Sequence, residues 1–170
     1  MSKKIFWVLA GYFLFTGCSV FTTMQQREEK YGKEIPVIEQ SFASPTVRSD
    51  DNWRIYLKAY DPDGDIKSVV AYFSGIGGAG QLFSVAVPKG TEKELSGYVY
   101  WFPGPDVEPY SEGLMTIQVE DLVGHFSKPV SFPMRIEPAA KQQAPPQGAF
   151  EEKDLGPILI NVRTTRGMAK

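Results

Sequence analysis

The sequence predicts an all-β fold, an antiparallel β-sandwich of about seven strands. Short segments between residues 36 and 137 alternate apolar and polar residues, as strands with one buried face do. Clusters of Gly, Pro, Asp and Ser interrupt these segments at intervals of about ten residues, a spacing typical of sandwiches. A segment of about a hundred residues has the usual size of one such domain and buries a core without disulfides.

The clearest strand is WRIYLKAY, residues 53–60, in which Trp53, Ile55, Leu57 and Ala59 fall on one face. The same alternation recurs in residues 114–121 and 128–136. Prolines at positions 129 and 133 lie on the polar face of that last segment, which indicates an edge strand or a bulge, since proline cannot donate to a ladder. The remaining strands are expected at 36–43 with a continuation at 45–48, and at 66–74, 81–87 and 95–102.

Residues 1–17 have the organisation of a secretory signal peptide. Lys3 and Lys4 precede an apolar stretch, Ile5–Phe15, that is too short for a comfortable transmembrane helix. The only cysteine of the chain, Cys18, stands where cleavage is expected. A plain signal peptide with an incidental cysteine, or a retained signal anchor, is the alternative.

The stretch FTGC resembles the signal of bacterial lipoproteins, although Phe15 stands where that family usually has leucine. The resemblance implies that Cys18 is lipidated and becomes the N-terminus, which also explains a lone thiol in an exported protein. Ser19 in place of Asp implies delivery to the outer membrane of a Gram-negative cell, with the domain facing the periplasm. The expected partner of the N-terminus is therefore the membrane, held through acyl chains.

The charge balance excludes two classes of partner. The chain has 18 basic and 20 acidic residues, and removal of residues 1–17 takes away two lysines and no acid, leaving a net charge of −4. A nucleic-acid-binding protein would show a basic stripe instead. The same balance argues against a polybasic contact with anionic lipid.

The chain is expected to divide into a tether, one domain and a tail. Residues 18–35 are polar and predict a flexible tether, in which Met24–Tyr31 is a possible short helix. The sandwich spans 36–137, and the Pro/Ala/Gln-rich residues 138–150 predict an extended linker. In the tail, 151–170, the alternation of Ile158, Ile160 and Val162 predicts a strand. That strand either pairs with an edge of its own sandwich or with another protein, or the tail is disordered.

Two longer stretches resemble the immunoglobulin-like sandwich domains of bacterial exported proteins. These are AYDPDGDIKSVVAYF and GLMTIQVEDLVGHFSKPVSF. Asp121, Gly124 and Ser127 match the family's D-x-x-G-N-x-S pattern, whereas His125 replaces its usual Asn and Met115 stands where a Tyr is frequent. The resemblance covers residues 36–137. It implies the architecture of the domain but not its function, because this fold carries many unrelated functions.

The stretch DPDGD raises the question of a metal site. Counted from Asp61, the glycine and the twelfth residue do not match an EF-hand loop. The residues fit a tight turn between two strands. In an immunoglobulin-like sandwich this turn shares one end with the turn after the penultimate strand, so Asp61, Asp63, Asp65 and Asp121 are expected to approach one another. A structural turn and a calcium site both remain open, and calcium is the one cofactor considered.

Four tyrosines form the candidate binding surface. Tyr56 and Tyr60 point away from the core face of their strand, and Tyr98 and Tyr100 alternate in SGYVYWF. If the two strands are neighbours, these rings gather on the outer face of a sheet, where exposed aromatic patches mark contact sites. Alternatively, they are cross-strand pairs that stabilise the sheet or are covered by the tail.

Two further motifs are not expected to carry chemistry. GIGGAG matches G-x-G-x-x-G, but a strand rather than a helix follows it, which favours a hairpin loop. His125 is the only histidine, and no serine lies in a G-x-S-x-G elbow.

We therefore expect a non-catalytic, lipid-anchored envelope protein that binds a protein partner. The alternative is an extracytoplasmic carbohydrate-binding module that uses the tyrosines.

Overall fold

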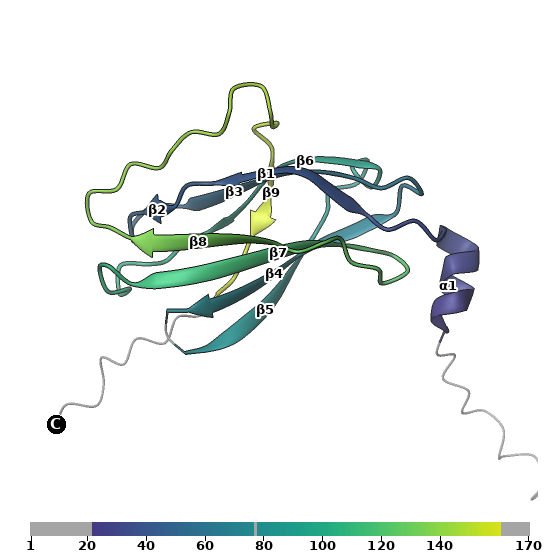
Figure 1. Ribbon diagram of the computed structural model, residues 1–170, viewed down its shortest axis with the longest axis horizontal. Coiled ribbons are helices and arrows are strands. Elements are labelled where there is room, and N and C mark those ends of the chain that lie inside the picture. The colour runs from purple at the N-terminus through teal and green to yellow at the C-terminus, as the bar shows by residue number, and fades with distance from the viewer. Residues whose placement is uncertain (1–21, 77, 161–170) are drawn as a thin grey trace, which may run out of the picture.

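A computed structural model describes residues 22–76 and 78–160, which form one short helix and two packed β-sheets (Figure 1). One sheet has the strand order β1-β3-β6-β9 and the other the order β2-β8-β7-β4-β5. The predicted sandwich is confirmed. Its elements are α1 (Met24–Tyr31), β1 (Val37–Ala43), β2 (Thr46–Val47), β3 (Trp53–Tyr60), β4 (Ile66–Gly75), β5 (Gly78–Ala86), β6 (Glu94–Trp101), β7 (Glu112–Asp121), β8 (Val130–Ile136) and β9 (Asp154–Pro157).

The topology is immunoglobulin-like. Strands β1, β3 and β6 lie side by side in one sheet, and β8, β7 and β4 in the other. This is the distribution of the first, second and fifth strands against the third, sixth and seventh that defines such sandwiches. Two pairs depart from the expected antiparallel pattern, because β2 runs parallel to β8 and β9 runs parallel to β6.

The core consists of the inward faces that the alternation predicted. Trp53, Ile55, Leu57 and Ala59 of β3 are at most 2% exposed. Alternate residues of β7 and β8 pack against them from the other sheet. The prediction for Pro133 also holds, since only the two-residue strand β2 lies beyond β8 and it pairs with residues 135–136.

Strand β9 occupies the place beside β6 that the fourth strand takes in constant-type immunoglobulin domains. Lys153 O accepts the Tyr98 N–H at 2.9 Å, and Ile158 N–H donates to Tyr100 O at 2.7 Å. Gly97 makes this approach possible, because a Cβ at that position would lie 2.5 Å from Lys153 O. The tail therefore pairs with its own sandwich, and the described strand is 154–157, which ends before Ile158 and Ile160. Residues 161–170 lie outside the described part of the chain.

The linker, which the sequence predicted only to be extended, is docked on the sandwich. Gln142 donates to Asp51 and Asn52 at 2.9 and 2.8 Å, and Gln143 N–H donates to Ser44 Oγ at 3.1 Å. In Figure 1 this segment runs from β8 across the upper sheet to β9. The folded unit thus extends to residue 160 instead of ending at 137, because the tail supplies a strand.

The predicted tether is also partly folded. Residues 24–31 form α1. The helix begins with a capping box between Thr23 and Gln26 and ends at Gly32, which has φ 117°. Cys18 and the signal segment lie outside the described residues. Within the described part of the chain, no helix is long and apolar enough to cross a bilayer.

We expect β9 to be an integral part of the fold. Leu155 is 5% exposed, so Leu155→Ala should lower the free energy of unfolding by about 2–5 kcal/mol through loss of buried surface and a residual cavity. Chemical denaturation of the full chain measures this. Leu159→Ala is the matched control, because Leu159 is 71% exposed and its truncation should cost less than about 0.5 kcal/mol. Equal stability of the two variants would show that β9 does not hold the sandwich together.

Candidate functional site

The DPDGD stretch forms the predicted tight turn after β3. Asp61 Oδ1 accepts the N–H groups of Asp63 and Gly64 at 2.8 and 3.2 Å, and the backbone N–H of Gly64 also donates to Asp61 O. Gly64 has φ 74°, a conformation that glycine adopts without strain. One oxygen of Asp61 is therefore used to hold the turn.

Asp121, the last residue of β7, organises the neighbouring turn in the same way. Its Oδ1 accepts the N–H groups of Gly124 and His125 at 2.6 and 2.8 Å. Its Oδ2 lies 2.9 Å from Nδ1 of the His125 ring. His125 therefore occupies a structural position in this turn, where its ring orients the Asp121 carboxylate.

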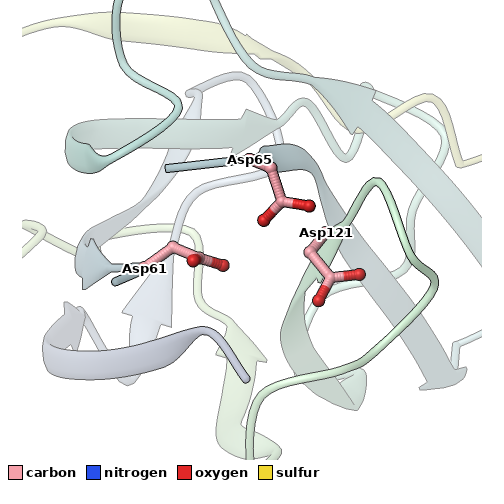
Figure 2. Close-up of side chains that lie close together, drawn as sticks. All are labelled: Asp61, Asp65 and Asp121. Carbon is pink, nitrogen blue, oxygen red and sulfur yellow. The ribbon is translucent and has the colours of Figure 1, made fainter. Parts of the chain in front are cut away.

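Three of the four predicted acidic residues meet between these two turns. Asp61, Asp65 and Asp121 each offer a carboxylate oxygen, and these oxygens all lie within 4.8 Å of one another. Figure 2 shows the three side chains turned toward one another, Asp61 and Asp65 from the two ends of the turn between β3 and β4, and Asp121 from the end of β7. The three residues are 0%, 7% and 1% exposed, respectively. Among the described residues, they are the group of acidic, His or Cys side chains that could hold a metal ion.

Asp63 has a different role from the predicted one. Its side chain is not in the cluster; instead its Oδ2 accepts the N–H of Glu34 at 2.8 Å. This contact holds the segment between α1 and β1 against the turn. Asp63 lies in the middle of the turn and is exposed, whereas Asp61 and Asp65 at its two ends are buried.

Burial controls the electrostatics of the cluster. Desolvation, reinforced by the charges of Asp61 and Asp121, raises the pKa of Asp65 from 3.8 to about 6, although the Leu122 N–H acts in the opposite direction. Desolvation also raises the pKa of Asp61, against the two backbone N–H groups of its turn. Like charges confined in a buried space favour protonation or a bound cation.

Helix α1 docks on this end of the sandwich. Arg27 Nη1 donates to Val123 O at 3.0 Å, in the turn organised by Asp121. Glu28 Oε1 lies 3.5 Å from His125 Nε2. The His125 ring thus stands between the helix and Asp121, and the N-terminal segment is attached to the same loops that form the acidic cluster.

The four tyrosines are brought to one sheet, but they are not an open surface. Tyr56 lies opposite Tyr98 in the β3–β6 ladder, with ring centroids 5.4 Å apart, and Tyr100 follows at 6.5 Å from Tyr98. Tyr60 lies at the other end of β3, opposite Glu94. Tyr56 is only 5% exposed, and the other three rings are half-buried.

The chain that returns from the linker covers this aromatic cluster. The Phe150 ring lies 5.6 Å from that of Tyr56, and the Tyr56 hydroxyl donates to the Glu152 carboxylate at 3.1 Å. Arg54 lies over the Tyr98 ring at 4.8 Å and pairs with Glu152 at 3.5 Å. Phe150 and Glu152 therefore cover Tyr56, whereas Tyr60, Tyr98 and Tyr100 stay half-buried, so the four rings do not form one exposed surface.

An exposed apolar surface lies instead on the outer face of the five-stranded sheet, where the sequence reasoning did not place one. Tyr72, Leu82 and Leu114 are 46%, 69% and 40% exposed. Tyr72 is directly opposite Leu82 on one side and Thr116 on the other. The sequence signal is that alternate positions in the middle of three strands carry no charged residue, and these positions form one surface only once the pairing of the strands is known.

The glycine-rich stretch is the predicted hairpin loop. It joins β4 to β5, with Gly75 paired with Gly78. Tyr72 extends over Gly80, where a Cβ would collide with its hydroxyl. The glycines therefore serve the hairpin and the packing of Tyr72.

Comparison with known proteins finds a likeness in structure. No protein-family profile and no curated protein matches the sequence at a significant level. Among solved structures, the chain is similar to the PKD domain of an M14-like peptidase from a Thermoplasmatales archaeon, with a TM-score of 0.37 and 10% identity. The match covers 62% of this chain and 97% of that domain.

The raised pKa of Asp65 predicts a pH dependence of stability in the presence of a chelator. A carboxyl whose pKa is higher in the folded than in the unfolded chain destabilises the fold once it ionises, so stability should rise as the pH falls from about 7.5 to 5. Thermal unfolding at both pH values measures this, and Asp65→Asn should flatten the dependence. An Asp65→Asn variant with an unchanged pH dependence would contradict the assignment.

Proposed function

We propose that this protein is a lipid-anchored, non-catalytic component of the cell envelope whose sandwich binds another protein. The observation that carries the proposal is the outer face of the five-stranded sheet, whose centre is uncharged and partly apolar and which the described residues of the linker and tail do not cover. The N-terminal sequence supplies the anchor, by its resemblance to lipoprotein signals.

The middle of this face is suited to a neutral partner. Its exposed apolar side chains alternate with hydroxyl and amide groups, such as Thr116, which shares a hydrogen bond of 2.9 Å with Ser131. Ion pairs mark its ends: Lys67 with Glu120 at 2.8 Å, and Arg135 with Glu112 at 3.9 Å. An apolar centre within a polar rim is the usual composition of a protein–protein contact.

The edge of the sheet favours an extended polypeptide as the occupant. Strand β5 is the outermost strand, has nine residues and contains no charged residue. Natural edge strands usually carry Lys or Pro that prevent further pairing, so an uncharged edge is suited to strand addition by a partner. The pairing partner's alternate side chains would then extend the face formed by Leu82 and Tyr72.

A hollow at one end of the face offers room for an anchoring side chain. It has a volume of about 490 Å³ and is lined by Leu114, Pro133 and Gly75, among others. A pocket that receives a buried anchor is the arrangement found at the energetic centre of many interfaces.

A protein fits this surface better than a polysaccharide does. Sugar binding by stacking needs exposed planar rings, and the tyrosine cluster that was the candidate platform is packed against Phe150 and Glu152. Tyr72 is the exposed ring at the centre of the open face.

We expect Leu82→Lys to abolish capture of the partner. A charge at the middle of β5 both disrupts the apolar face and blocks strand addition. The tagged full chain is crosslinked in envelopes, and adducts that wild-type protein forms are identified by mass spectrometry. Leu159→Lys is the matched control, because Leu159 is similarly exposed but lies in the tail. Identical adducts from all three proteins, or recovery of polysaccharide alone, would contradict the proposal.

The anchoring part has its own test. Cys18→Ala removes the thiol that lipidation requires, so the variant should leave the membrane fraction, whereas wild-type protein should remain there. Fractionation followed by immunoblotting measures the distribution. A variant that still sediments with membranes would refute attachment through this residue.

A further inference from the structure

We propose that Asp61, Asp65 and Asp121 bind a calcium ion that joins the turn after β3 to the turn after β7. The proposal concerns the end of the sandwich and does not depend on the partner-binding face.

The first observation is a pair of buried oxygens that lack partners. Asp61 Oδ2 and Asp65 Oδ2 are inaccessible to solvent, and neither has a hydrogen-bond partner among the described residues. The two residues are 0% and 7% exposed. A buried carboxylate oxygen without a donor is costly, so native structures rarely contain one unless an ion or ordered water satisfies it. Here the two oxygens face the same small space as Asp121 (Figure 2).

The second observation is how the carboxylates are fixed. Asp61 uses Oδ1 to hold its own turn and leaves Oδ2 for the shared space. Asp121 uses Oδ1 for two backbone N–H groups, and its Oδ2 contacts the His125 ring. His125 Nδ1 can donate to this oxygen in the tautomer that carries the proton there. Ligands held by such outer contacts need little reorganisation when an ion binds.

The chemistry of the donors favours calcium. All three donors are carboxylate oxygens, which suit hard cations rather than zinc. Calcium binds oxygen at about 2.3–2.6 Å and accepts six to eight ligands in flexible geometry, with water completing the sphere. Two of its ligands can therefore lie up to about 5 Å apart, which accommodates the spread of up to 4.8 Å between these oxygens. Magnesium binds oxygen at about 2.0–2.1 Å and demands near-ideal octahedral geometry, so three carboxylates held by separate hydrogen bonds suit it less well.

The ion would also act on the docked N-terminal segment. Val123, which accepts from Arg27, and His125, which faces Glu28, both belong to the turn that carries Asp121. A cation that rigidifies this turn stabilises the surface on which α1 sits. His125 is a positioning residue in this arrangement, since it acts on the ion through Asp121.

The test is calcium titration of the full chain, purified in detergent and freed of metal with a chelator. Calorimetry should report one bound calcium per chain, and calcium should raise the midpoint of thermal unfolding more than magnesium does at the same concentration. Asp65→Asn should lose this response. In chelator the same variant should unfold at a higher temperature than wild type, because the mutual repulsion is relieved, so loss of binding is distinguished from loss of folding.

Two more variants complete the design. Asp106→Asn changes an exposed acid in the loop before β7, at the opposite end of that strand from Asp121, and should respond to calcium as wild type does. His125→Ala should weaken calcium binding about 10- to 100-fold, as loss of an outer contact to a ligand does. No response of wild type up to about 10 mM calcium, which exceeds the dissociation constants of extracellular calcium modules, would overturn the proposal. So would an equal response to magnesium, or an undiminished response of Asp65→Asn.

Discussion

Phe73 of β4 and Trp101 of β6 meet across the interior of the sandwich, with their ring centroids 4.9 Å apart. Trp101 is also paired with Trp53 in the ladder between β6 and β3. All three side chains are at most 2% exposed. A shift of one residue in the register of any of these strands would therefore expose a large ring to solvent. Burial of these rings therefore sets the register of both sheets, and the positions of the loops follow from that register.

The acidic end of the sandwich is a consequence of this register. Asp61 follows the last residue of β3, Asp65 precedes the first residue of β4, and Ile66 is paired with Asp121 of β7. The core strands thus bring three carboxylates to one point. Backbone N–H groups of the two turns donate to the carboxylates of Asp61 and Asp121. The electrostatic cost of that arrangement is tolerable if the turns require those carboxylates and a cation or protons compensate them.

The two outer faces of the sandwich differ in how far other parts of the chain cover them. The linker and tail return over the face of β3 and β6, where Phe150 and Glu152 cover Tyr56, and then supply β9. The face of β4, β5 and β7 receives no such cover from the described residues and keeps Leu82 exposed. Among the described residues, the chain thus covers Tyr56 on one face and leaves the uncharged centre of the other face exposed.

Local pattern was sufficient for the strands, their inward faces and the tight turn at Asp61, because alternation and turn chemistry depend on residues within a few positions of one another. The resemblance to immunoglobulin-like domains also placed Asp121 near that turn. Only the tertiary structure decided that Asp63 turns away toward Glu34, that the tyrosines are covered, and that 154–157 becomes a strand. Each of these outcomes depends on contacts between residues far apart in the chain, such as Lys153 approaching the bare backbone of Gly97, and no local pattern encodes them.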